Sequence, residues 1–129
     1  MTIEKISAIV QFSGKQFSPK KAEDKIGIRF LQKYEPGYII ETGRRKGKLI
    51  PYGCASLEAP DAIEDDDKIL WLARTLKGKM KILEECAMED AHFYIGYFYA
   101  DQCNCTLTKE ELKALADVGI DFLFSCYGE

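Results

Sequence analysis

The sequence predicts an α+β domain with a ferredoxin-like or related fold, in which a single sheet of four to five strands carries helices packed on one face. Three observations lead to this class. Residues 91–100 are unusually rich in aromatic side chains, which is typical of a strand inside a sheet. Each end of the chain carries a strand, helix and strand pattern. A long segment with helical spacing lies between these two patterns.

The first pattern begins at residues 6–12, where apolar side chains alternate as in a half-buried strand that ends at Gly14. Ser18 is a good N-cap, and Pro19 suits the first helical position because its missing N–H would be unpaired there anyway. Gly27 suits the C-terminal end of this helix. Residues 28–31 are expected to start a second extended segment.

The middle of the chain is expected to hold two more strands and a long helix. Residues 32–53 are rich in turn signals, with strand candidates at 38–40 and 49–57. Residues 61–88 are predicted to be helical because their apolar side chains recur every three or four positions. Gly78 interrupts this pattern and marks where the helix would divide.

The second pattern begins with the strand at residues 91–100. Its aromatic side chains occupy both faces, which predicts a position inside the sheet. Thr108 and Glu111 form the sequence signature of a capping box at the start of a helix that Gly119 ends. Residues 120–124 then alternate as the last strand.

Composition limits the class of protein. With 129 residues the chain is expected to form a single domain, residues 1–129. The net charge of −3 makes nucleic acid an unfavourable partner. The start of the chain has no signal-peptide pattern, and no apolar run is long enough for a membrane helix. We therefore expect a cytoplasmic protein without membrane attachment, and the five cysteines are expected to be reduced thiols.

Several features taken together resemble the bacterial family known as domain of unknown function 4279. The resemblance runs along nearly the whole chain and rests on the following residues: Phe12-Ser13-Gly14, Phe17-Ser18-Pro19, Ile26-Gly27, Gly43, Tyr52-Gly53, Ser56-Leu57-Glu58, Leu72, Leu76, Leu112, Leu115 and Gly119. The resemblance implies the size and fold class given above. The family has no agreed activity, so the resemblance implies none.

Three cysteines form the sharpest candidate for chemistry: Cys103, Cys105 and Cys126. If the two strand, helix and strand patterns share one sheet, the corner after residue 100 approaches the end of the chain. Three thiolates would suit zinc or a redox centre. However, the C-x-C spacing is not that of a zinc knuckle, and the single histidine, His92, begins the aromatic strand far from the corner. The alternative is that these cysteines only pack.

A basic run forms the other candidate, and its four cations are Arg44, Arg45, Lys46 and Lys48. Such a run could attract an acidic partner or bind phosphate, or it could be a solvated loop. No nucleotide-binding glycine motif is present, and a catalytic triad would have to use His92. No catalytic residue and no cofactor are therefore expected.

The sequence favours a non-enzymatic interaction protein, of the kind that immunity or antidote proteins represent. Another protein is the expected partner, which would bind at an exposed sheet edge or at the basic run, and the chain is expected to be a monomer or homodimer. The alternative is a small enzyme or a metal or redox protein that uses the Cys103, Cys105 and Cys126 corner.

Overall fold

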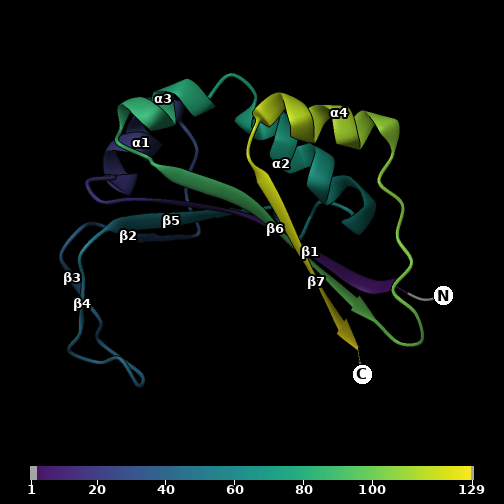
Figure 1. Cartoon of the computed structure of the whole chain (residues 1–129), viewed down its shortest axis with the longest axis horizontal. Coiled ribbons are helices and arrows are strands. Elements are labelled where there is room, and N and C mark those ends of the chain that lie inside the picture. Colours follow the sequence, from purple (N-terminus) through teal and green to yellow (C-terminus); the bar gives the residue numbers. More distant parts are fainter. Residues whose placement is uncertain (1–2, 129) are drawn as a thin grey trace. The chain divides into compact units, whose positions relative to one another are not determined.

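The computed structural model describes residues 3–128 and confirms the α+β class. Five strands form one mixed sheet in the order β2-β5-β1-β6-β7, and β3 pairs with β4 in a separate two-stranded sheet (Figure 1). The strands are β1 (Ile3–Gly14), β2 (Gln32–Tyr34), β3 (Tyr38–Ile39), β4 (Leu49–Ile50), β5 (Gly53–Glu58), β6 (Asp90–Tyr99) and β7 (Asp121–Gly128). The helices are α1 (Pro19–Ile26), the 3-10 turn η1 (Asp65–Asp67), α2 (Lys68–Leu76), α3 (Met80–Glu85) and α4 (Lys109–Val118).

The chain divides into two compact units, and strands β1 and β6 contribute to both. Unit 1 contains residues 3–10, 58–78 and 92–128 of the described chain, and unit 2 contains residues 11–57 and 79–91. Each unit therefore joins segments that are far apart in the sequence. The expectation of a single domain stays a prediction.

In unit 1, helices α2 and α4 lie side by side over one face of the strands (Figure 1). Strand β6 pairs with β7 in parallel, and Tyr97 lies opposite Cys126 in this register. Because side chains alternate along a strand, every second residue of β6 faces the helices. The core on that side contains Val10, Ile69, Leu72, Leu76, Phe93, Ile95, Tyr97, Leu115 and Val118, all of which are buried.

In unit 2, helices α1 and α3 pack against each other. The Oγ of Ser18 accepts a hydrogen bond from the backbone N–H of Lys21, and Gly27 ends α1 in the left-handed conformation, as predicted. The rings of Phe12 and Phe30 lie 5.7 Å apart. The rest of this core is formed by Phe17, Ala22, Ile26, Ala55, Leu57, Leu83 and Met88.

Three predicted elements differ from the structure. The second extended segment begins later than predicted, with β2 at Gln32: the N–H of Phe30 donates to the carboxylate of Glu23 on α1, 2.7 Å away, and the N–H of Leu31 donates to the carbonyl of Ser56 on β5. The predicted strand 49–57 is interrupted at Pro51, which has no N–H to donate to a ladder. The predicted helix 61–88 begins with a turn, so that regular helix starts only at Lys68.

Two other predictions about these helices are confirmed. Gly78 has a φ of 76° and separates α2 from α3, a conformation that glycine adopts without steric cost. Thr108 caps α4, and both hydrogen bonds of the capping box with Glu111 are present. Across residues 3–128, none of the helices has the length and apolar character that a membrane span requires.

Candidate functional site

The structure brings two of the three candidate cysteines together. Cys103 lies in the connection from β6 to α4, and Cys126 lies on β7. Their Sγ atoms are 2.8 Å apart, although 23 positions separate the residues in the sequence. Both are free thiols, Cys103 partly exposed and Cys126 exposed. The predicted approach of the corner to the end of the chain is therefore present.

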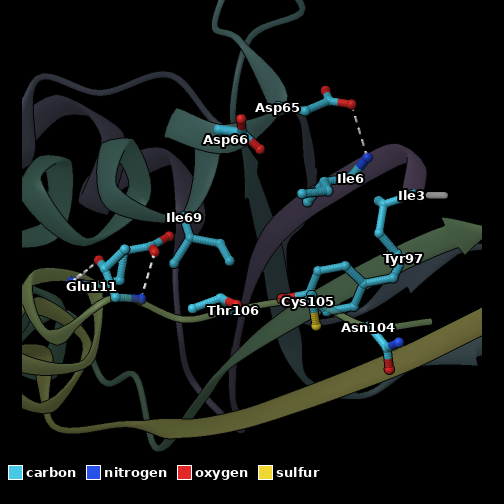
Figure 2. Close-up of a pocket in the computed structure, with 11 residues that line it drawn as sticks. Ile3, Ile6, Asp65, Asp66, Ile69, Tyr97, Asn104, Cys105, Thr106 and Glu111 are labelled. Carbon is cyan, nitrogen blue, oxygen red and sulfur yellow. Dashed lines mark hydrogen bonds between the residues drawn. The ribbon is translucent and has the colours of Figure 1, made fainter. Parts of the chain in front are cut away.

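A cavity of about 630 Å³ opens in unit 1, and its lining includes Asn104 and Cys105, which follow Cys103 in the chain. Figure 2 shows its lining, which comes from the first half of β1, from η1 and α2, from β6, from the connection between β6 and α4, and from the start of α4. Polar and apolar side chains are mixed in it: Ile3, Ile6, Asp65, Asp66, Ile69, Tyr97, Asn104, Cys105, Thr106, Thr108 and Glu111.

Most polar groups of this cavity are already bound to the protein. Asp65 accepts a hydrogen bond from the N–H of Ile6 at 3.1 Å (Figure 2). It also pairs with Lys68 at 2.8 Å. The hydrogen bond from Lys68 lowers the pKa of Asp65, while burial opposes this effect. Glu111 is held by the N-cap of α4. Two of the three carboxylates thus have structural roles, which leaves no free pair for acid–base catalysis in this cavity.

Cys105 faces this cavity, where its sulfur lies beside the ring of Tyr97 (Figure 2). Burial, and then the nearby Cys105, raise the pKa of Tyr97 above its ordinary value. Within residues 3–128 no group of three or more His, Cys, Asp or Glu side chains is arranged to hold a metal ion. The metal interpretation of Cys103, Cys105 and Cys126 therefore has no geometric support in that range.

The basic run lies in unit 2, in the loop that joins β3 to β4. Its four cations Arg44, Arg45, Lys46 and Lys48 are all exposed. The loop is closed by two backbone hydrogen bonds between Ile40 and the segment 47–48, at 2.8 and 3.0 Å. These two strands form an arm that extends away from α1 and α3 of the same unit (Figure 1).

The sequence predicted β7 as a strand but did not identify it as the exposed edge of the sheet. It is the last strand of the sheet, and among the described residues no strand pairs with its outer edge. Leu123, Phe124 and Tyr127 are 45%, 60% and 42% exposed. The sequence predicts residues 120–124 as the last strand of the chain, and only the strand order identifies this strand as an edge of the sheet.

On the face of unit 1 away from α2 and α4, aromatic side chains connect β7 to β6. The hydroxyl groups of Tyr94 and Tyr127 are 2.5 Å apart, and Tyr94 also donates to the Oγ of Ser125 at 3.3 Å. The rings of Phe98 and Tyr127 stack with centroids 4.9 Å apart. The edge of β7 that faces β6 is thus held by strand pairing and by these aromatic contacts. Among the described residues, no strand pairs with its other edge.

No protein-family model, curated protein or solved structure matches this chain.

Proposed function

We propose that this chain is a non-enzymatic protein-binding domain, comparable to an immunity or antidote protein, which binds an extended segment of its partner along β7. The observation that carries the proposal is the open outer edge of β7, together with three large and partly exposed apolar side chains on the two faces of this strand. An edge strand presents unpaired backbone N–H and C=O groups that a further strand can pair with.

The residue content of β7 supports this role. Natural edge strands are usually short or carry lysine or proline, which discourage further pairing. Strand β7 has eight residues, with neither lysine nor proline among them, and Asp121 is its only charged residue. The opposite edge of the sheet, β2, has only three residues. An edge that is long, apolar and unprotected suits an interaction site.

The expected occupant is an extended segment of another protein with apolar side chains at alternate positions. Leu123 and Tyr127 lie on one face of β7, and Phe124 lies on the other, because side chains alternate along a strand. A partner strand would pair its backbone with β7 and bury these side chains on both faces. Backbone pairing supplies affinity in this mode, and side-chain contacts supply specificity.

A photo-crosslinking amino acid at position 123 tests the proposal in cells. Leu123 is replaced by a benzophenone amino acid, and Leu112 on α4, which is 52% exposed, is replaced in the control. We expect an adduct with one defined protein from position 123 and none from position 112. Equal adducts from both positions, or none from 123, would reject the edge. An adduct with a second copy of this chain would indicate a homodimer instead.

The captured partner then allows a measurement of affinity. Phe124→Lys places a charge on the open edge, and Leu112→Lys is the matched control on α4. We expect Phe124→Lys to weaken binding at least about tenfold, because a desolvated charge opposes burial at an interface. The control should bind normally. Unchanged binding by Phe124→Lys would move the interface away from β7.

The loop of Arg44, Arg45, Lys46 and Lys48 is a second candidate surface, for an acidic partner. It is favoured by the exposure of all four cations at the end of the β3 and β4 arm. Within residues 3–128 none of the four forms an ion pair. We also propose a cytoplasmic location and membership of the domain of unknown function 4279 family, both on the sequence features alone.

A further inference from the structure

The contact between Cys103 and Cys126 is a second feature of unit 1 that the binding proposal does not use. Parallel pairing of β6 with β7 places Cys126 opposite Tyr97, near the end of β6. The chain leaves β6 at Tyr99 and reaches Cys103 four residues later, before α4 begins. The connection between β6 and α4 therefore lies against β7 at the position of Cys126.

The two sulfur atoms are in direct contact, although 23 positions separate the residues in the sequence. The 2.8 Å between the Sγ atoms is longer than the about 2.0 Å of a covalent disulfide, yet it leaves no room for another atom between them. Neither thiol is buried, so a small reagent can reach the pair. We infer that Cys103 and Cys126 form a reversible intrachain disulfide by exchange with a low-molecular-weight disulfide.

The exchange proceeds in two steps that balance. The thiolate of Cys126 attacks one sulfur of the small disulfide, which breaks its S–S bond and releases one small thiolate. Cys103 then loses its proton and attacks the Sγ of Cys126, which releases the second small thiolate. Both released thiolates take up a proton. Two protein thiols are thus oxidised to one disulfide, and the small disulfide is reduced to two thiols.

The surroundings assign different roles to the two thiols. The hydrogen bond with Cys126 raises the pKa of Cys103 to about 11, and burial and the charges of Cys126 and Cys105 add to this effect. In the contact between the two sulfur atoms, either thiol can donate the hydrogen bond. Cys126 is exposed and Cys103 only partly exposed, so a small disulfide reaches Cys126 first, and Cys103 then resolves the mixed disulfide.

The other three cysteines are placed differently. Cys86 is buried, and burial raises the pKa of Cys54. Both are in unit 2. Cys105 is exposed, but its sulfur lies beside Tyr97 in the cavity. A disulfide confined to Cys103 and Cys126 is therefore a specific expectation, and it would enclose α4 in the closed loop.

Equilibration of the purified chain with mixtures of reduced and oxidised glutathione tests the inference. Free thiols are then trapped with an alkylating reagent, and mass spectrometry counts them and locates the linkage. We expect two of the five cysteines to be protected, with loss of two hydrogens and a peptide that joins residues 103 and 126. The reaction should reverse on addition of excess reduced glutathione.

Single variants separate the roles. Cys103→Ser should accumulate glutathione on Cys126, because the resolving thiol is absent, and Cys126→Ser should form no intrachain disulfide. Cys105→Ser and Cys54→Ser are the controls, and both should oxidise like the parent chain. The oxidised parent should also melt higher than the reduced one by on the order of 10 °C, because the crosslink restricts the unfolded state.

Several results would overturn the inference. One is a linkage to Cys105 in place of Cys103, and another is alkylation of all five thiols throughout the glutathione series. Failure of Cys103→Ser to retain glutathione would reject the assigned order of attack. None of these measurements involves a binding partner, so the outcome is independent of the proposed use of β7.

Discussion

Lys68 places an ammonium group among the buried residues of unit 1, where its side chain is 8% exposed. Its Nζ pairs with Asp65 at 2.8 Å and donates to the carbonyl of Ile6 at 3.0 Å. Asp65 in turn accepts from the N–H of Ile6. Two side chains thus attach the start of β1 to the start of α2, which helps to form the cavity wall.

Replacing Asp65 with alanine should destabilise the chain by about 1–3 kcal/mol, because a buried cation loses its partner and a backbone N–H loses its acceptor. Glu110→Ala is the matched control, since its pair with Arg74 is about two-thirds exposed on both sides. The control should change stability by no more than about 0.5 kcal/mol. Urea denaturation measures both. Equal effects would show that burial does not distinguish the two pairs.

The carboxylate of Asp65 should also affect how the free energy of unfolding depends on pH in acid. Because the folded pKa of Asp65 is lowered, its contribution is present above the unfolded pKa of about 3.9 and disappears as the pH falls through the folded value. Asp65→Asn should therefore be less stable than the parent above about pH 5, the difference should begin to shrink below about pH 4, and it should vanish only below the folded pKa of Asp65. Denaturation curves across this range measure the effect, and a constant difference would contradict it.

The four cations Arg44, Arg45, Lys46 and Lys48 should matter for association and not for folding. Their replacement by serine should leave the melting temperature nearly unchanged, because exposed charges contribute little to stability. Binding to an acidic partner should slow by about an order of magnitude at low salt, and the difference should shrink as salt is added. A large loss of stability would assign these residues to the fold.

At the scale of elements, α4 connects β6 to β7, and the N-cap at Thr108 stabilises its first turn. The Oγ1 of Thr108 accepts a hydrogen bond from the N–H of Glu111 at 3.1 Å, and the N–H of Thr108 donates to the carboxylate of Glu111 at 2.9 Å. Thr108→Ala should cost about 1 kcal/mol, whereas Thr108→Ser should cost much less, because serine keeps the hydroxyl group. Thermal denaturation compares them. Equal losses would show that the methyl group of Thr108, and not the cap, matters.

At the scale of the whole molecule, β6 contributes residues to both units, as β1 does. It lies between β1 and β7, and Phe93, Ile95 and Tyr97 are at most 2% exposed. We expect the slowest amide exchange at residues 94–98, because these N–H groups are released only when the sheet opens. The loop at residues 43–48 serves as the internal reference. Exchange at 94–98 as fast as in this loop would contradict the assignment.

Local features of this protein were readable from the sequence because neighbouring residues decide them. The caps at Ser18 and Thr108, the glycine at residue 27 and the division at Gly78 each depend on a few adjacent backbone groups. The aromatic strand was also identified correctly, since its pattern extends over ten residues.

Only the tertiary structure decided which segments meet. Residues 28–31 look extended in the sequence, but a carboxylate from α1 satisfies the N–H of Phe30. The sequence predicts residues 120–124 as a strand without saying which strand it pairs with, and the strand order places β7 at an edge. The approach of Cys103 and Cys126 was an expectation that depended on the sheet. Strand order and contacts across 23 residues arise from packing between distant segments, which no local pattern encodes.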